Sequence, residues 1–323
     1  LYLSADASRD LIPSMPDMYD EPFADFSALP TYLVSKFARE DVTVALSGDG
    51  GDEMLGGYVR HFMGPKIWDR IKYIPRPLRQ VLGAGIHALP QDRWNAMKPA
   101  HPQFGRSMHK LGGIVGARGR FDLYSRLVSL WDTPPVTGEI ADHAPLYRDR
   151  TDTLGLKFAE EMMVWDTLYY LPYDILTKVD RASMAVSLEA RAPLLDRRVY
   201  EYCWTLPLKY KIRDGKGKWL LRQVLKRHVP DHLFERPKQG FTVPIGAWLR
   251  GDLKDWAADL LSLPKLNDTG LIDAAAIRAL WEDHQSGHTD HGYALWTVLM
   301  FQAWVEKWHG SGAGKKNAVG LAA

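Results

Sequence analysis

Ser47, Asp49, Asp52 and Glu53 place a hydroxyl and three carboxylates close together in the stretch VTVALSGDGGDEMLGGY, at 42–58. Crowded carboxylates repel one another unless a cation lies between them, so this spacing indicates a site for a metal ion. The glycines among them let the backbone approach a ligand closely. A surface turn with solvated acids is the alternative interpretation, because such turns are common.

A strand has to hold this loop in place. Val42, Val44 and Leu46 are apolar at alternate positions, so we predict a strand over 42–46. Its loop would lie at the carboxyl edge of a sheet, where open α/β proteins bind ligands. A helix predicted over 30–39 precedes the strand, which is typical of the end of a βαβ pattern. The loop lacks both the lysine of a G-x-x-x-x-G-K-S/T phosphate loop and the acid spacing of a calcium loop.

Three blocks of this sequence resemble one known family. SGDGGDEMLGGY is similar to the second nucleotide-site loop of the synthetase domain of asparagine synthetases. LEARAPLLD at 188–196 resembles the family pattern E-A-R-x-P-F/L-L-D, and RPKQGF at 236–241 resembles R-x-K-x-x-F. The resemblance runs from about Glu21 to about Gly310.

The resemblance implies an α/β, predominantly helical fold of the ATP-pyrophosphatase type, like that of the adenine nucleotide α-hydrolases. We expect the first strands of that fold to be missing, because only 42–46 and the first few residues suggest a sheet. We therefore expect a partial synthetase domain over 1–310 and a flexible tail over 311–323.

The resemblance also implies a reaction. A substrate carboxylate attacks the α-phosphate of ATP, which gives an acyl-adenylate and pyrophosphate, and ammonia then displaces AMP to form an amide. ATP and Mg²⁺ are the expected cofactors, and aspartate and ammonia are the expected substrates. We expect a ligase of amino-acid biosynthesis, whose ammonia comes from an N-terminal glutaminase domain of the same polypeptide.

Asp52 matches the family aspartate that binds Mg²⁺, and Lys218 and Lys238 match lysines that stabilise the phosphates. Cations fixed in this way would balance the charge that develops as pyrophosphate leaves. Lys218 directly precedes a helix expected over 219–228, where a lysine opposes the helix dipole unless it is exposed or an anion such as phosphate lies near. Without the resemblance, solvent exposure would be the simpler interpretation of Lys238.

Ser47 and Gly48 match residues that touch the nucleotide through a small side chain and backbone. Asp49 matches the acidic position that meets the intermediate and helps ammonia lose a proton after its attack. Asparagine-forming members often carry glutamate at this position. A different acceptor therefore stays open, because members of the family also amidate sugar acids and precursors of cyclised antibiotics.

Two family features do not occur in the 323 residues: the pyrophosphate loop S-G-G-x-D-S and the N-terminal nucleophilic cysteine of the glutaminase. The one cysteine, Cys203, lies mid-chain among apolar residues. We therefore expect a fragment that is inactive by itself and lacks the glutaminase domain; a homodimer is compatible with this expectation. A non-catalytic scaffold is the remaining alternative, although Asp49, Asp52, Lys218 and Lys238 are all present.

The composition argues against several other classes. Apolar residues make up 46% of the chain and charged residues 25%, which is typical of a soluble globular protein. A net charge of +2 is too balanced for a nucleic-acid-binding surface. One cysteine allows no internal disulfide. No apolar run is as long as a membrane span and the N-terminus is not a signal peptide, so we expect a cytoplasmic location and no membrane partner.

The remaining chain is expected to be helical. We predict two buried helices within 151–190, whose methionine and aromatic face belongs to the core. We expect the charges within them to pair with one another; substrate contact through Asp180 or Arg181 is the alternative. His288 and His291 have no third ligand nearby in the sequence, which disfavours zinc. The charged residues of the helix pair are Asp174, Lys178, Asp180, Arg181, Glu189 and Arg191.

Overall fold

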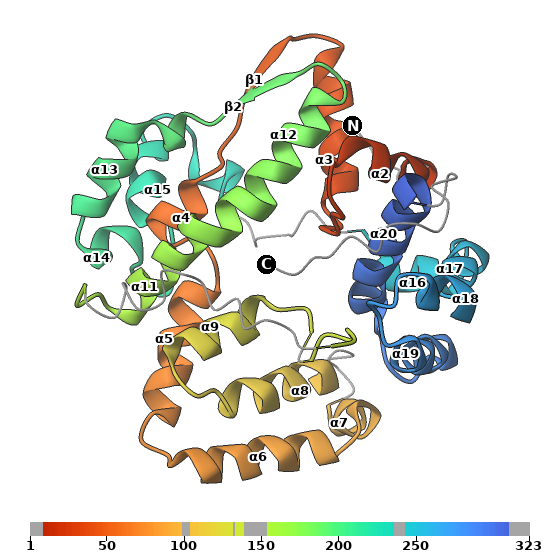
Figure 1. The fold of residues 1–323 in the computed structure, drawn as a ribbon. Helices are drawn as coiled ribbons and strands as arrows, with labels where there is room; N and C mark the ends of the chain where they lie inside the picture. Colours follow the sequence, from red (N-terminus) through yellow and green to blue (C-terminus); the bar gives the residue numbers. More distant parts are fainter. Residues whose placement is uncertain (1–8, 99–103, 132, 139–153, 236–242, 310–323) are drawn as a thin grey trace. The chain divides into compact units, whose positions relative to one another are not determined.

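The computed structural model describes residues 9–98, 104–131, 133–138, 154–235 and 243–309. The chain divides into two compact units. Unit 1 comprises residues 1–34, 135–139 and 242–323, and unit 2 comprises residues 35–134 and 140–241. Helices greatly exceed strands in the described residues, which confirms the predominantly helical α/β class (Figure 1). None of the helices in the described residues combines the length and the apolar character that a membrane crossing requires.

The sheet of unit 2 has two parallel strands in the described residues, β1 (Val44–Leu46) and β2 (Glu189–Arg191) (Figure 1). Val44 pairs with Glu189, and Leu46 pairs with Arg191. β1 confirms the strand predicted over 42–46, although it is shorter. α3 (Ala28–Arg39) precedes it and confirms the helix predicted over 30–39.

The prediction of helix up to residue 190 is wrong at its end. The helical run stops at Met184, and Ser187 adopts a left-handed backbone with φ of 59° before β2 begins. β2 carries too little apolar alternation to be recognised from its sequence, because Glu189 and Arg191 are both charged. These two side chains are exposed and pair with each other at 2.8 Å.

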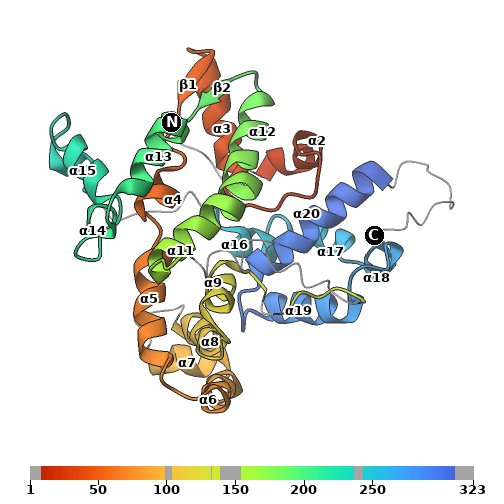
Figure 2. The ribbon, with the colours of Figure 1, turned by 60° about the vertical axis from the view of Figure 1, so that its left-hand side comes forward.

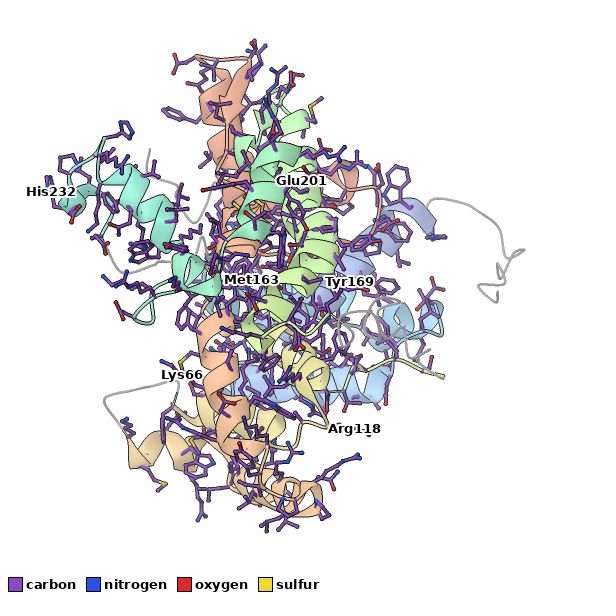
Figure 3. All side chains as sticks on the ribbon, turned by 90° about the vertical axis from the view of Figure 1, so that its left-hand side faces the viewer. Lys66, Arg118, Met163, Tyr169, Glu201 and His232 are labelled. Atoms are coloured by element: carbon purple, nitrogen blue, oxygen red, sulfur yellow. The ribbon has the colours of Figure 1, made fainter. Side chains whose placement is uncertain are left out.

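The helices predicted within 151–190 form one continuous run rather than two separate helices. α11 (Phe158–Trp165) leads into η2, a π-helix (Asp166–Leu176), and then into α12 (Thr177–Met184) (Figure 1). Met163 of α11 and Tyr169 of η2 lie along this run in Figure 3. Pro172 lies inside η2, because the wider π turn accommodates a residue that lacks a backbone N–H. The predicted burial of the methionine and aromatic face is confirmed for α11.

Helices between the loop and this run surround a hydrophobic core of unit 2. Its buried members include Ile71, Ile114, Leu123, Phe158 and Trp165. α5 and α9 both contribute to this core, and α5 packs against α11. The helices of this region that contribute to the core are α5 (Arg60–Ile71), α8 (Phe104–Val115) and α9 (Arg120–Val128), and α6 (Arg76–Ala88) and α7 (Gln91–Met97) pack against α8.

A second group of unit 2 helices packs beside α4 (Gly51–Leu55), as Figure 2 shows. Asp196 caps the start of the helix over 197–205, since its side chain accepts a hydrogen bond from the backbone N–H of Arg198. The helix predicted over 219–228 is present but ends at Leu225. The elements are η3 (Pro193–Leu195), α13 (Arg197–Thr205), α14 (Leu208–Lys211), α15 (Trp219–Leu225) and η4 (Asp231–Leu233).

Unit 1 is assembled around its last helix, α20 (Gly292–His309). Leu295, Trp296 and Leu299 of this helix are almost fully buried. The indole N–H of Trp308 donates to the carbonyl oxygen of Pro16 at 3.0 Å, which ties the start of the chain to its end. The other elements are η1 (Ile12–Ser14), α2 (Met15–Met18), α16 (Ile245–Arg250), α17 (Lys254–Leu260), α18 (Leu263–Asp268) and α19 (Ala274–Ser286).

The imidazole of His284, on α19, is fully buried in unit 1 and contacts α16 and the residue that precedes α20. Its Nε2 donates to the carbonyl oxygen of Gly246 at 3.1 Å. Its Nδ1 accepts a hydrogen bond from the backbone N–H of His291 at 3.2 Å, and it lies 3.3 Å from Nη2 of Arg250 and 3.6 Å from Oδ1 of Asp290. Because Nδ1 accepts from a backbone N–H, the ring is neutral. Burial, and then the charge of Arg250, lower the pKa of His284.

We expect acid to destabilise unit 1 through His284. Its pKa in the folded chain lies below the ordinary value of 6.5, so the unfolded chain binds the proton first as the pH falls. The stability that the neutral ring contributes is therefore present above about pH 6.5 and is lost below it, by up to about 1.4 kcal/mol per pH unit. Urea unfolding of the parent and of His284→Gln, at about pH 7.5 and about pH 5.5, measures this contribution. An equal loss of stability in both proteins would contradict it.

Candidate active site

The candidate site lies where β1 ends in unit 2. The backbone N–H of Ser47 donates to the carbonyl oxygen of Arg191 at 2.8 Å, so the pairing with β2 continues one residue beyond β1. Gly50 then takes a left-handed backbone, with φ of 86°, and α4 begins at Gly51. The chain therefore passes from a strand through a short loop into a helix, which is the arrangement expected at a ligand-binding sheet edge.

Ser47 and Asp49 contact each other within this loop. The Ser47 hydroxyl donates to Oδ2 of Asp49 at 2.7 Å, which fixes the direction of both side chains. Both residues are partly buried, whereas Gly48 between them is exposed. A Cβ atom added at Gly48 would meet nothing within 4 Å. The backbone at Gly48 is thus accessible, and a carboxylate of known direction lies beside it.

Asp52 and Lys218 form an ion pair at the start of α4. Nζ of Lys218 lies 3.0 Å from Oδ1 of Asp52, and the two side chains are 30% and 24% exposed. The backbone N–H of Lys218 donates to the carbonyl oxygen of Leu55 at 2.8 Å, so the lysine is held at its backbone as well. Lys218 also has a left-handed backbone, with φ of 55°, which costs a non-glycine residue about 1 kcal/mol or more. Strained residues of this kind cluster at functional sites.

Gly57 leaves the space that this ion pair fills. A Cβ atom at position 57 would overlap Oδ1 of Asp52 and would press on Cε of Lys218. The backbone N–H of Gly57 donates to the carbonyl oxygen of Asp52 at 2.8 Å. Gly57, in the second glycine pair of the loop motif, therefore leaves room for the Asp52 side chain, five residues earlier in the sequence.

The E-A-R-x-P-L-L-D block supports the loop by strand pairing and by apolar packing. Its first three residues form β2, which pairs with β1. Leu194 and Leu195 follow and pack against a small core made by Met54, Leu55 and Cys203. Burial raises the pKa of the Cys203 thiol. This block thus positions the loop through one strand and two leucines, and its charged residues stay at the surface.

Comparison with known sequences decides the family. The model of the asparagine synthase family matches residues 1–306. The chain belongs to the asparagine synthase family.

Relatives at moderate identity agree with this assignment. A protein of Mycobacterium tuberculosis (strain ATCC 25618 / H37Rv), provisionally named asparagine synthetase (glutamine-hydrolyzing), is 34% identical over 310 residues, which are 94% of this chain and 45% of that protein. Asparagine synthetase (glutamine-hydrolyzing) 1 of Bacillus subtilis (strain 168) is 30% identical over 311 residues, which are 94% of this chain and 46% of that protein. The chain therefore spans about half the length of these curated relatives.

This member of the asparagine synthase family has a buried network that the sequence analysis missed. Tyr58 donates its hydroxyl to Oε1 of Glu53 at 2.6 Å, and Glu53 is only 1% exposed. Asp166, at the start of η2, is fully buried and accepts hydrogen bonds from Arg60. His61 lies 2.6 Å from the same carboxylate. The available signal was Asp166 among the apolar and aromatic residues of a helical segment, with Arg60 and His61 directly after the glycine-rich loop.

Burial and charge set the protonation of this network. Burial raises the pKa of Glu53 and of Tyr58, so the tyrosine remains a hydrogen-bond donor. Burial alone would also raise the pKa of Asp166, but hydrogen bonds and charge from His61 and Arg60 outweigh it and hold that pKa below its ordinary value. Burial lowers the pKa of His61 despite the nearby carboxylate. Asp166 is therefore the ionised partner of the Arg60 guanidinium.

The other predicted residues have mixed outcomes. Lys238 and the rest of the third block lie outside the described residues, as does the tail over 311–323. Glu189 and Arg191 do pair, but on β2 rather than inside a helix. Asp180 and Arg181 are exposed on α12.

Within the described residues, no three His, Cys, Asp or Glu side chains lie close enough together to hold a metal ion. His291 instead lies 2.6 Å from Oδ2 of Asp283, and His288 lies 2.6 Å from the hydroxyl of Ser286. Asp52 likewise belongs to no three-ligand cluster in this part of the chain.

We expect Gly57→Ala to disrupt the loop and Gly48→Ala to leave its fold unchanged. The first substitution forces a methyl group into the Asp52 carboxylate, whereas the second meets open space. Overpacking of this kind costs about 1–3 kcal/mol, so the melting temperature of Gly57→Ala should fall by several degrees. Differential scanning fluorimetry of both variants beside the parent measures the difference. Equal melting temperatures for the two variants would show that the packing around Asp52 is not tight.

Proposed function

We propose that this chain is the carboxylate-activating part of a glutamine-dependent asparagine synthetase. The observation that supports this most directly is the contact of Lys218 with Asp52 beside the Ser47–Asp49 pair, at the end of β1. A cation and two carboxylates of fixed direction are what an adenylate-forming site needs around a nucleotide. Family membership over residues 1–306 supports the same assignment.

The proposed first step forms an acyl-adenylate. A carboxylate oxygen of aspartate attacks the α-phosphorus of ATP, the bond from that phosphorus to the bridging oxygen breaks, and pyrophosphate leaves with the electron pair. Lys218 holds a positive charge near the departing phosphates, and Lys238 is proposed to do the same. Charge stabilisation by such preorganised groups is commonly a large share of catalysis.

Asp52 fits a magnesium ligand. Mg²⁺ usually keeps several waters and binds one or two carboxylates together with substrate phosphates, and Asp52 supplies a partly buried carboxylate of that kind. Mg²⁺ bound there would neutralise charge on the phosphates of ATP. Lys218 also directs Asp52, because its ammonium group pairs with the carboxylate.

The proposed second step makes the amide. The nitrogen of ammonia attacks the acyl carbon, the bond from that carbon to the AMP oxygen breaks, and one proton leaves the nitrogen. Asp49 is proposed to accept this proton, with the Ser47 hydroxyl holding Oδ2 in place. The exposed backbone at Gly48 would contact the nucleotide.

We also propose that the ammonia comes from a glutaminase domain in the same polypeptide. The chain covers 45% of the mycobacterial relative, and that relative is named as glutamine-hydrolyzing. The pyrophosphate loop S-G-G-x-D-S is not found in the 323 residues, so the proposed site needs a further segment to be complete.

We expect the 323-residue chain alone to show no pyrophosphate exchange into ATP with aspartate and Mg²⁺. The reason is that it lacks one of the two phosphate loops that adenylate formation requires in the proposed mechanism. The exchange of labelled pyrophosphate into ATP measures the first step without any ammonia source. Exchange well above a protein-free control would contradict the need for the second loop.

In the complete enzyme we expect Asp52→Asn to lower synthetase turnover on the order of 10²–10³-fold, while glutaminase activity is retained. An amide has the shape of the carboxylate but is a much poorer ligand for a hard cation. Glu201→Gln is the matched control, since Glu201 is exposed and pairs with the exposed Arg197 one helical turn away. Turnover is measured with aspartate and, separately, with a sugar-linked carboxylate over a range of Mg²⁺.

Parental turnover of Asp52→Asn at limiting Mg²⁺ would contradict the metal assignment. If the enzyme acts on the sugar-linked carboxylate and not on aspartate, the proposed reaction type stands and the proposed carboxylate substrate changes.

A further inference from the structure

We propose that Asp166 is a positioning residue for the stretch at 47–57, called here the acidic loop, and that it acts through Arg60, Tyr58 and Glu53. The role of that loop in metal and nucleotide binding rests on the proposed function. The positioning itself is a property of the folded chain and is tested without substrate.

The loop needs support from outside its own helix. α4 has five residues, from Gly51 to Leu55, and helices this short are not stable by themselves. Asp52 and Glu53 lie in its first turn, so their directions depend on what holds α4. Lys218 contacts Asp52, and both side chains are partly exposed, whereas Glu53 is buried.

Tyr58 is the contact that holds Glu53. Its hydroxyl donates to Oε1 of Glu53 at 2.6 Å, across the turn at Gly56 and Gly57. This bond closes the loop on itself, since it joins the first turn of α4 to the segment that leads into α5. A buried carboxylate without such a donor would be strongly destabilised.

Arg60 and Tyr170 fix the ring of Tyr58. The guanidinium carbon of Arg60 lies 3.9 Å from the centroid of the Tyr58 ring and 4.7 Å from that of Tyr170. The two rings meet edge to face, with centroids 5.5 Å apart. A guanidinium held over an aromatic face strengthens such a contact most when it is shielded from water.

Asp166 in turn fixes Arg60. Nε and Nη2 of Arg60 both donate to the Asp166 carboxylate, at 2.9 Å and 2.8 Å. Tyr124 donates its hydroxyl to Oδ1 at 2.8 Å, and His61 approaches Oδ2 at 2.6 Å. A movement of Asp166 would therefore release Arg60, and a movement of Arg60 would remove one of the contacts that fix the ring of Tyr58.

The first test measures hydrogen exchange of backbone amides in the 323-residue chain. Tyr58→Phe removes only the hydroxyl, and we expect the amides of Met54 and Gly57 to exchange about tenfold faster. These amides donate to Gly50 and Asp52 within the loop. The amide of Ser47, which donates to β2, should exchange at the parental rate. Tyr73→Phe is the matched control, since Tyr73 is 81% exposed.

Asp166→Asn should produce the same pattern, and it tests the full relay. Parental exchange in a folded Asp166→Asn would overturn the role of Asp166. If this variant does not fold, Arg60→Gln replaces it, since Arg60 joins Asp166 to the ring of Tyr58.

Glu53→Gln and Glu53→Ala test the last contact. The amide of Glu53→Gln keeps an oxygen that accepts from Tyr58, so this variant should exchange near the parental rate, whereas Glu53→Ala should resemble Tyr58→Phe. Parental exchange at Met54 and Gly57 in Tyr58→Phe would overturn the proposal.

The second test separates this proposal from the proposed function. In the complete enzyme, Tyr58→Phe should raise the Mg²⁺ concentration for half-maximal turnover several-fold, and saturating Mg²⁺ should restore most of kcat. A general loss of stability would lower kcat without restoration. Faster loop exchange with parental Mg²⁺ dependence would overturn the positioning role in an active enzyme. An enzyme with no synthetase activity under any condition would overturn the proposed function and leave the exchange result standing.

Discussion

The buried negative charge of Asp166 constrains how several helices of unit 2 pack together. The Asp166 carboxylate is fully buried, so it must be surrounded by donors that remain in place. Those donors come from α5, through Arg60 and His61, and from α9, through Tyr124. Hydrophobic packing brings these helices together without fixing their rotation, because apolar contacts have little direction. The buried carboxylate supplies that direction, and the acidic loop is attached to the same group of residues.

The loop itself illustrates how small residues and charges divide the work. Glycine at 57 gives the Asp52–Lys218 pair its space, and the leucines after β2 cover the apolar side of α4. The Asp52 carboxylate is thereby directed while it stays partly exposed. Lys218 balances the charge of Asp52, so the loop can hold two acids close together in the folded chain. Asp49 is directed separately, by the hydroxyl of Ser47.

Short sequence patterns were enough to predict elements such as β1 and α3. Alternating apolar residues indicated β1, and the proline and apolar face at 30–39 indicated α3. The pairing of Asp52 with Lys218 spans 166 residues in sequence, and resemblance to a family was needed to connect them. β2 escaped prediction because two of its three residues are charged.

Long-range polar contacts escaped for a different reason. Asp166 and Arg60 are 106 residues apart, and no sequence pattern in either segment indicates that the two side chains pair. The π segment around Pro172 is also set by its surroundings, since proline by itself predicts only an interruption or a new start of a helix. Such features are determined by which helices pack together, and a single sequence does not contain that information in readable form.

The parallel ladder of β1 and β2 also has a consequence for how the chain folds. It joins Leu46 to Arg191, so the intervening stretch of about 140 residues becomes a closed loop when the strands pair. Closing a loop of this length costs on the order of 4 kcal/mol in chain entropy before any contact repays it. During synthesis the acidic loop leaves the ribosome long before its partner strand exists. The helices between the two strands are therefore expected to assemble first, and topology predicts that the candidate site is among the last parts of this unit to form.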